Sequence, residues 1–147
     1  MGFFTKANVR YNTIFKWLVQ GYFMSVLSFS VAAEELLTLR DFLRFTVSTF
    51  HAAGLFFGHG SSEAYDEAAY LLLHSLHLPP ERLEVFLDAR LLKTERAHLL
   101  AVLQQRIIER KPAAYITQEA FLGDFKFYVD ERVIVPRSFI AELLHLP

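Results

Sequence analysis

Apolar residues recur at three- and four-residue steps through most of the chain, which is the period of an amphipathic helix. One such stripe runs through the first periodic segment and consists of Leu36, Leu39, Leu43, Val47 and Phe50. Capping and helix-breaking residues divide the pattern into four expected helices. These are Ala32–Phe50 before Gly54, a helix capped by Ser61 or Ser62 that ends before Pro79, a short helix over Glu81–Asp88, and one capped by Thr94 and closed by Lys111–Pro112.

The period changes to that of a strand after Pro112. Tyr115–Ile116 has the character of a short β segment, and apolar and polar residues alternate over Phe125–Asp130, as in a half-buried strand. We expect Asp130–Arg132 to form a turn and Val133–Val135 to return as the second strand, with Pro136 ending the pairing. The predicted fold is mainly α, a small helical bundle followed by a C-terminal β-hairpin.

The composition excludes several classes of protein and of binding site. A chain of 147 residues that is 53% hydrophobic and 15% aromatic is long enough for a domain with a real core, and it is not a disordered chain. The net charge of −1 with 15 Lys and Arg residues gives no electrostatic footprint for direct nucleic acid binding. The absence of cysteine excludes disulfides, thiolate metal sites and cysteine nucleophiles, and it is compatible with a reducing, cytoplasmic location.

Residues 1–33 differ from the rest because they contain basic residues but no acidic one. An uncharged stretch over residues 17–33 follows the basic residues, which is the layout of a secretory signal or membrane anchor. The other interpretation is an upstream extension of a cytoplasmic protein, with Met24 as the original start. The corresponding division is a leader over 1–33, a helical domain over 34–112, and a hairpin linker over 113–147.

The residues themselves offer little catalytic chemistry. His74 and His77 are three residues apart on an expected helix and could chelate a metal, but no third ligand has the spacing of a site. His59 lies between two glycines, which allow close approach of a ligand, although a plain turn explains the pattern as well. The 147 residues contain no Gly-x-Gly-x-x-Gly phosphate loop and no Gly-x-Ser-x-Gly nucleophile elbow.

Four segments near the C-terminus, Arg110–Thr117, Phe121–Gly123, Phe125–Val129 and Val133–Arg137, resemble the end of the N-terminal domain of the protein-glutamine methyltransferases. These are the S-adenosylmethionine-dependent enzymes of the HemK/PrmC/PrmB family. The resemblance extends over roughly Glu34 to Leu144.

Three further segments, Phe57–Gly60, Tyr128–Arg132 and Pro136–Ser138, are similar to the PrmB branch, which methylates a glutamine side-chain amide of the third large-subunit ribosomal protein. The release-factor branch usually has Pro-Arg-Pro at the last of these places. Phe139 stands where the PrmB branch usually has proline.

The resemblance implies a division of labour. The helical bundle would help to recognise a ribosomal protein substrate, and the hairpin would lead into an α/β Rossmann-like methyltransferase domain. Phe121, Gly123, Pro136 and Arg137 are the implied substrate contacts, because these family segments lie near the target glutamine. The family's cofactor loop and its Asn-Pro-Pro-Tyr motif do not occur in the 147 residues. The implied protein is therefore truncated before its catalytic domain, binds no S-adenosylmethionine itself and is inactive alone.

A hypothesis of a different class also fits the sequence, a non-catalytic helical interaction protein anchored in a membrane by residues 17–33. For Arg137 without the family context, a solvated arginine is the plain interpretation.

Overall fold

The computed structural model describes residues 29–57, 63–122 and 125–135. Contacts divide the chain into two compact units, Met1–Glu35 and Leu36–Pro147. In the first unit, residues 29–35 are helical, and the rest of the expected leader lies outside the described residues. Among the residues described, no helix combines the length and the apolar character needed to cross a membrane.

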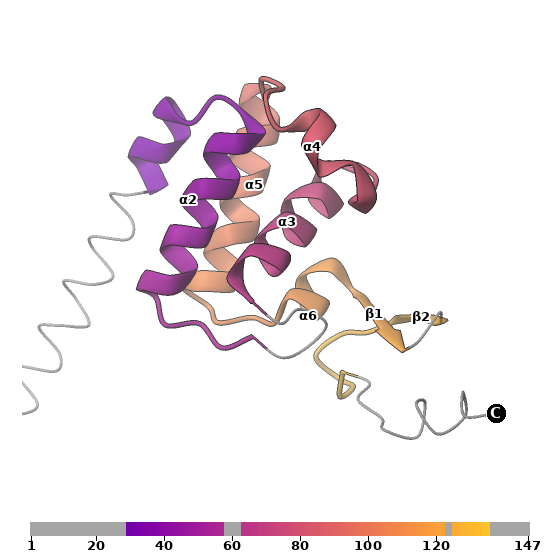
Figure 1. The fold of residues 1–147 in the computed structure, drawn as a ribbon. Helices are drawn as coiled ribbons and strands as arrows, with labels where there is room; N and C mark the ends of the chain where they lie inside the picture. Colours follow the sequence, from indigo (N-terminus) through magenta and orange to yellow (C-terminus); the bar gives the residue numbers. More distant parts are fainter. Residues whose placement is uncertain (1–28, 58–62, 123–124, 136–147) are drawn as a thin grey trace, which may run out of the picture. The chain divides into compact units, whose positions relative to one another are not determined.

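The second unit is mainly α and ends in a two-stranded hairpin, as predicted (Figure 1). Helix α3 is its central element, since it packs against α2, α5, α6 and η1. The elements in chain order are α2 (Leu39–Ala52), α3 (Ala64–Ser75), η1 (Pro80–Arg82), α4 (Leu83–Phe86), α5 (Lys93–Ile107), α6 (Ala113–Thr117), β1 (Glu119–Leu122) and β2 (Phe125–Tyr128).

The prediction of one continuous helix over Ala32–Phe50 is wrong, because residues 36–38 separate α2 from the preceding helical residues. Thr38 caps α2: its Oγ1 accepts a hydrogen bond from the Asp41 N–H (3.2 Å), and the Asp41 carboxylate accepts from the Thr38 N–H (2.9 Å). The Leu91 N–H donates to the Leu37 carbonyl at 2.8 Å. This capping box and the pairing with residues 89–91 supply the backbone hydrogen bonds that a continuous helix would have made.

Helix α2 ends as predicted, at Gly54. This glycine has φ +57° and donates to the His51 carbonyl, and the Leu55 N–H donates to the Phe50 carbonyl. The two bonds form a Schellman motif, in which glycine takes the left-handed position without steric cost. Helix α3 ends in the same way, but His77 takes the left-handed position with φ 55°.

The predicted helix starts need correction. The N-cap of α3 is Glu63, not Ser61 or Ser62, which lie outside the described residues. Helix α5 begins at Lys93, so Thr94 is inside it. The Leu92 N–H donates to the Glu95 carboxylate at 2.7 Å, so this backbone N–H at the start of the helix has a hydrogen-bond partner. The expected short helix over Glu81–Asp88 is the 3₁₀ turn η1 followed by the four residues of α4.

The core lies between α2, α3 and α5. The stripe of α2 is confirmed at Leu39, Leu43 and Phe50, which are all buried. The largest fully buried apolar side chains of the three helices are Leu39, Phe42, Phe50, Leu71, Leu72, Leu99 and Leu103. Burial of large aliphatic and aromatic side chains contributes roughly 1.5–3 kcal/mol each, so this cluster is the main source of stability of the bundle.

The hairpin exists, but the strand partner predicted for Phe125–Val129 was wrong. Strand β2 pairs antiparallel with β1, with Glu119 opposite Tyr128 and Leu122 opposite Phe125. Residues 133–135 form no strand, and the Val133 N–H donates to the Asp130 carbonyl in a turn.

Two local expectations near the hairpin also fail. Tyr115–Ile116 is helical, within α6, because Pro112 supplies a suitable φ (−57°) at the helix start and Ala113–Ala114 favours the helical state. Strand β2 is exposed along its whole length instead of half-buried, and within the expected strand Phe125–Asp130 only Val129 is buried.

We expect Thr38→Ala to lower the free energy of unfolding by about 1 kcal/mol, because alanine cannot accept the Asp41 N–H at the start of α2. Urea unfolding at pH 7 measures the change. Ser48→Ala is the matched control: the exposed Ser48 hydroxyl donates to the Arg44 carbonyl inside the helix, and its loss should change stability by less than about 0.5 kcal/mol. Equal losses in both variants would contradict the capping role of Thr38.

Hydrogen bonds from Thr38, first from its backbone, hold the pKa of Asp41 below its ordinary value of 3.8. A lowered pKa in the folded state contributes stability that is complete above the ordinary value and is lost as pH falls through the lowered pKa.

Candidate functional site

The structure describes only one of the four predicted contact residues. Phe121 lies in β1 with 57% of its surface exposed, opposite Lys126. Gly123, Pro136 and Arg137 lie outside the described residues. Phe121 is therefore the one member of the predicted set whose surroundings can be described.

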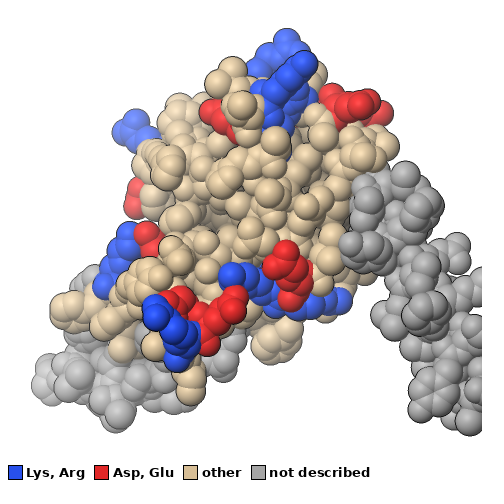
Figure 2. Space-filling view, turned by 180° about the vertical axis from the view of Figure 1, so that it is seen from behind, with Lys and Arg blue, Asp and Glu red and all other residues tan. Residues whose placement is uncertain are grey.

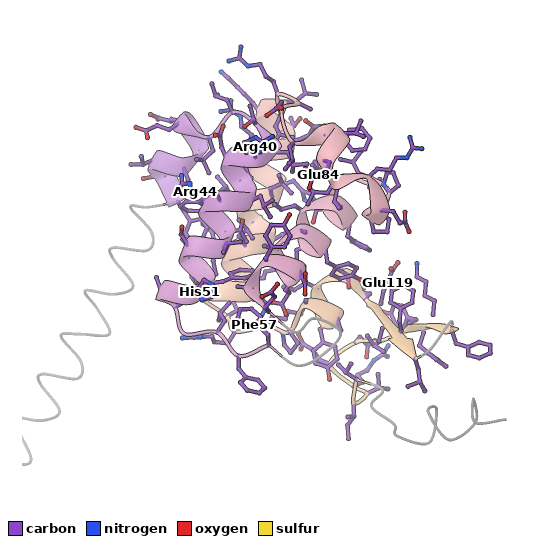
Figure 3. The ribbon with its side chains drawn as sticks, in the orientation of Figure 1. Arg40, Arg44, His51, Phe57, Glu84 and Glu119 are labelled. Carbon is purple, nitrogen blue, oxygen red and sulfur yellow. The ribbon has the colours of Figure 1, made fainter. Side chains whose placement is uncertain are left out.

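Phe121 shares one face of the hairpin with Glu119, Lys126 and Tyr128, because directly opposed residues of an antiparallel pair project to the same side. Lys126 Nζ lies 2.5 Å from Glu119 Oε1, and His74 Nε2, from α3, lies 3.5 Å from the same oxygen. Burial acts to raise the pKa of Glu119, but the hydrogen bonds from Lys126 and His74 outweigh it and hold that pKa below its ordinary value. Figure 3 shows Glu119 at the start of the hairpin.

Further hydrogen bonds connect the hairpin region to the helices. The Tyr70 hydroxyl of α3 donates to Thr117 Oγ1 of α6 at 3.1 Å, and burial raises the pKa of Tyr70. The Tyr115 hydroxyl donates to the Val133 carbonyl at 2.7 Å. Beneath these bonds lies a small apolar cluster formed by Ala114, Ala120, Val129 and Val135. The base of the hairpin is thus held by both polar and apolar contacts.

Charged residues around the hairpin occur in pairs. Lys111 Nζ lies 2.8 Å from Glu131 Oε1, and the Asp130 carboxylate accepts hydrogen bonds from the backbone and guanidinium of Arg132. These bonds, first those of the guanidinium, lower the pKa of Asp130 to about 2. Figure 2, a view from behind, shows blue and red side chains next to one another. The paired charges leave no strong field of one sign in this part of the chain.

Exposed apolar side chains concentrate on the hairpin and the turn after it. Of the eleven large hydrophobic residues that are exposed in the described part of the chain, six belong to this segment: Phe121, Phe125, Phe127, Tyr128, Val133 and Ile134. We call these six the hairpin surface. Such a concentration is typical of a surface that another protein segment covers.

A second feature is a pocket of about 270 Å³ in the bundle. Its lining comes from the α2–α3 connection, from α3 and α5, and from the start of α6, and it consists of Gly54, Leu55, Phe56, Glu67, Arg106, Arg110, Pro112 and Ala113. The pocket therefore joins segments that are far apart in the sequence.

Arg106 and Glu67 form a buried ion pair in this pocket. Arg106 Nε donates to Glu67 Oε1 at 2.6 Å, and both side chains are more than nine-tenths buried. A second guanidinium nitrogen donates to the Phe56 carbonyl at 3.0 Å, and the guanidinium carbon lies 5.9 Å from the ring centroids of both Phe50 and Phe57. Figure 3 shows Phe57 on the connection between α2 and α3. Arg106 thus fixes this connection through its backbone and through aromatic contacts.

Sequence reasoning missed this ion pair. Neither Glu67 nor Arg106 was singled out from the sequence as a site residue. A signal existed: Arg106 falls between Leu103 and Ile107, and Glu67 falls between Ala64 and Leu71, so each occupies a position inside an apolar stripe.

The structure changes the hypothesis of metal binding by His74 and His77. His77 lies beyond the end of α3 in the left-handed conformation, so the two side chains are not one turn apart on a helix. Within the described ranges, no three potential ligands among His, Asp and Glu come together. His59 lies outside those ranges.

Comparison with known proteins gives a family and several relatives. The family PrmC N-terminal domain matches residues 50–117. A ribosomal protein uL3 glutamine methyltransferase of Neisseria meningitidis serogroup B is 60% identical over 116 residues, which are 79% of this chain and 38% of the relative. The proteins of the same name from Bordetella pertussis and Burkholderia pseudomallei are 58% and 61% identical over 76% and 73% of this chain. The chain spans between a third and two fifths of the length of these relatives.

We expect Arg106→Met to lower the free energy of unfolding by about 3–5 kcal/mol, because it leaves the Glu67 carboxylate buried without its partner. The double variant Glu67→Leu/Arg106→Met should lose less than the single variant, since no unpaired charge remains. Urea unfolding of Arg106→Met, of Glu67→Leu and of the double variant forms the cycle. Additive losses would show that the two side chains do not act as a pair.

A separate prediction concerns Asp130. Carbon NMR of its carboxyl group should give a titration midpoint of about 2, and Arg132→Gln should move that midpoint up towards the ordinary value of 3.8. The favourable contribution of this pair is present above 3.8 and is lost as pH falls through about 2. Asp41, whose partners are different, serves as the internal control and should titrate unchanged.

Proposed function

Because residues 50–117 match the PrmC N-terminal domain family, we propose that this chain is the substrate-recognition domain of an S-adenosylmethionine-dependent glutamine methyltransferase. Its protein substrate is the ribosomal protein that the relatives' name gives, uL3, and the group methylated is a glutamine side-chain amide. The observation that carries the proposal is the 60% identity over 79% of the chain to a relative with this activity in its name.

The proposal assigns recognition and chemistry to different parts of the enzyme. The matched family is an N-terminal domain, and the relatives are more than twice as long as this chain. The cofactor-binding loop and the transfer of the methyl group then belong to the part of the relatives that this chain does not span. In this scheme residues 34–112 recognise the substrate, residues 113–147 lead towards the catalytic domain, and the enzyme acts in the cytoplasm, where ribosomal proteins are made.

The hairpin surface has the properties that a junction with another domain requires. Its aromatic and β-branched side chains are exposed, while the base of the hairpin is held by the bonds from Tyr70 and His74. A base held by these contacts and an apolar outer surface would let the hairpin support a neighbouring domain in one orientation.

Phe121 is the side chain that we propose to contact the substrate, together with Gly123, Pro136 and Arg137. Its ring is exposed, whereas the neighbouring Lys126 is held by Glu119. An exposed, flat ring on a supported strand can hold a planar amide in one orientation, and such positioning lowers the barrier of a transfer reaction. The ring performs no chemistry in this scheme.

The chain should bind purified uL3 by itself, and surface plasmon resonance measures the affinity. We expect Phe121→Ala to weaken binding by about tenfold, in the range found for an aromatic anchor of an interface. Val85→Ala is the control, because Val85 is 70% exposed in α4 and lies outside the hairpin surface. The recognition role is wrong if the unsubstituted chain does not bind uL3, and the role of Phe121 is wrong if both variants bind equally.

A further inference from the structure

We propose that the pocket between the α2–α3 connection, α3, α5 and the start of α6 binds an amide group of a partner polypeptide. The charges and hydrogen bonds of the pocket itself support this proposal. It rests on the proposed function only in taking the partner to be the protein substrate. The amide can belong to an Asn or Gln side chain or to the backbone, since both sources present the same chemistry.

Glu67 provides the acceptor. Its Oε1 receives the Arg106 Nε–H at 2.6 Å, and among the described residues no hydrogen bond reaches Oε2. The side chain is only 4% exposed and lines the pocket. Oε2 is not among the fully enclosed polar atoms that lack a partner, so a ligand that brings an N–H group into the pocket can reach it and form a charge-assisted hydrogen bond.

Arg110 provides donors at the same pocket. Its two terminal nitrogens donate to the Ala53 carbonyl at 2.8 Å and to the Gly54 carbonyl at 3.5 Å, which holds the guanidinium against the C-terminal end of α2. A guanidinium has five N–H donors in a fixed fork, so these two bonds leave others for a ligand carbonyl.

The acceptor of Glu67 and the donors of Arg110 favour a ligand that has both a donor and an acceptor. Glu67 and Arg106 neutralise each other, and Arg110 already faces the carbonyls at the end of α2. A carboxylate could accept from Arg110 but has no N–H to donate to Glu67, and an ammonium group would be repelled by the excess of guanidinium charge. An amide has a donor and an acceptor but no net charge, so it can use both sides of the pocket.

Size and shape agree with a single residue of a polypeptide as the ligand. A volume of about 270 Å³ is below the usual range of cofactor pockets, which begins near 300 Å³. Phe56 lines the pocket with 85% of its surface exposed, while its carbonyl is fixed by Arg106. The ring is free to cover a flat group that enters beside it.

The test uses the full chain and two small amides. Propionamide represents a side-chain amide and N-methylacetamide a backbone amide. Two-dimensional amide NMR should show saturable shifts confined to the lining residues, with the stronger response identifying the source. Methyl propionate, which has a carbonyl but no N–H, should bind at least about tenfold more weakly, as expected for the loss of one hydrogen bond to a charged group.

Phe56→Ala tests the pocket without disturbing the core, because the side chain is exposed. We expect propionamide to bind several-fold more weakly to this variant and unchanged to Val85→Ala. The inference is overturned if neither amide shifts the lining residues, if the ester binds as well as the amides, or if Phe56→Ala has no effect. Failure of the chain to bind uL3, with amide binding intact, would count against the proposed function alone.

Discussion

The buried ion pair between Arg106 and Glu67 is the interaction on which the arrangement of the bundle depends. It joins α5 to α3, and the same guanidinium holds the Phe56 carbonyl and lies near the rings of Phe50 and Phe57. Removing two charges from water costs several kcal/mol per ion, and the attraction between them recovers this cost only with good geometry and further hydrogen bonds. The contacts of Arg106 meet both conditions.

Such a pair specifies an arrangement more than it adds stability. Contacts between leucine side chains have no fixed partner geometry, whereas a guanidinium and a carboxylate at 2.6 Å define which positions of α3 and α5 lie side by side. The same contacts define the path of residues 54–57, and with it one wall of the pocket. The core supplies most of the free energy of folding, and the ion pair determines where the polypeptide between α2 and α3 runs.

The periodicity of the sequence predicted helices and a hairpin, but it did not predict features that depend on contacts between particular side chains. The stripe of α2, the stop at Gly54 and the final hairpin were recognised from repeating patterns. The break before Thr38 was missed because a capping box leaves an apolar stripe uninterrupted. The strand partner was misassigned because β1 has only the four residues Glu119–Leu122, which are too few to show a clear alternation. For the site, exposure of Phe121 agrees with the contact role predicted for it but does not test that role.

The hairpin differs from the bundle in how independently it can open. A two-stranded ribbon is marginal by itself, and the outer edge of β2 has no partner strand among the described residues. Its closure relies on the few contacts of Thr117, Glu119 and Val129, whereas α3 contacts four other elements. Backbone amides of β2 should therefore exchange with solvent through local opening, at a free energy well below that of global unfolding. Within the described part of the second unit, the hairpin surface thus lies on the segment that we expect to open before the helices.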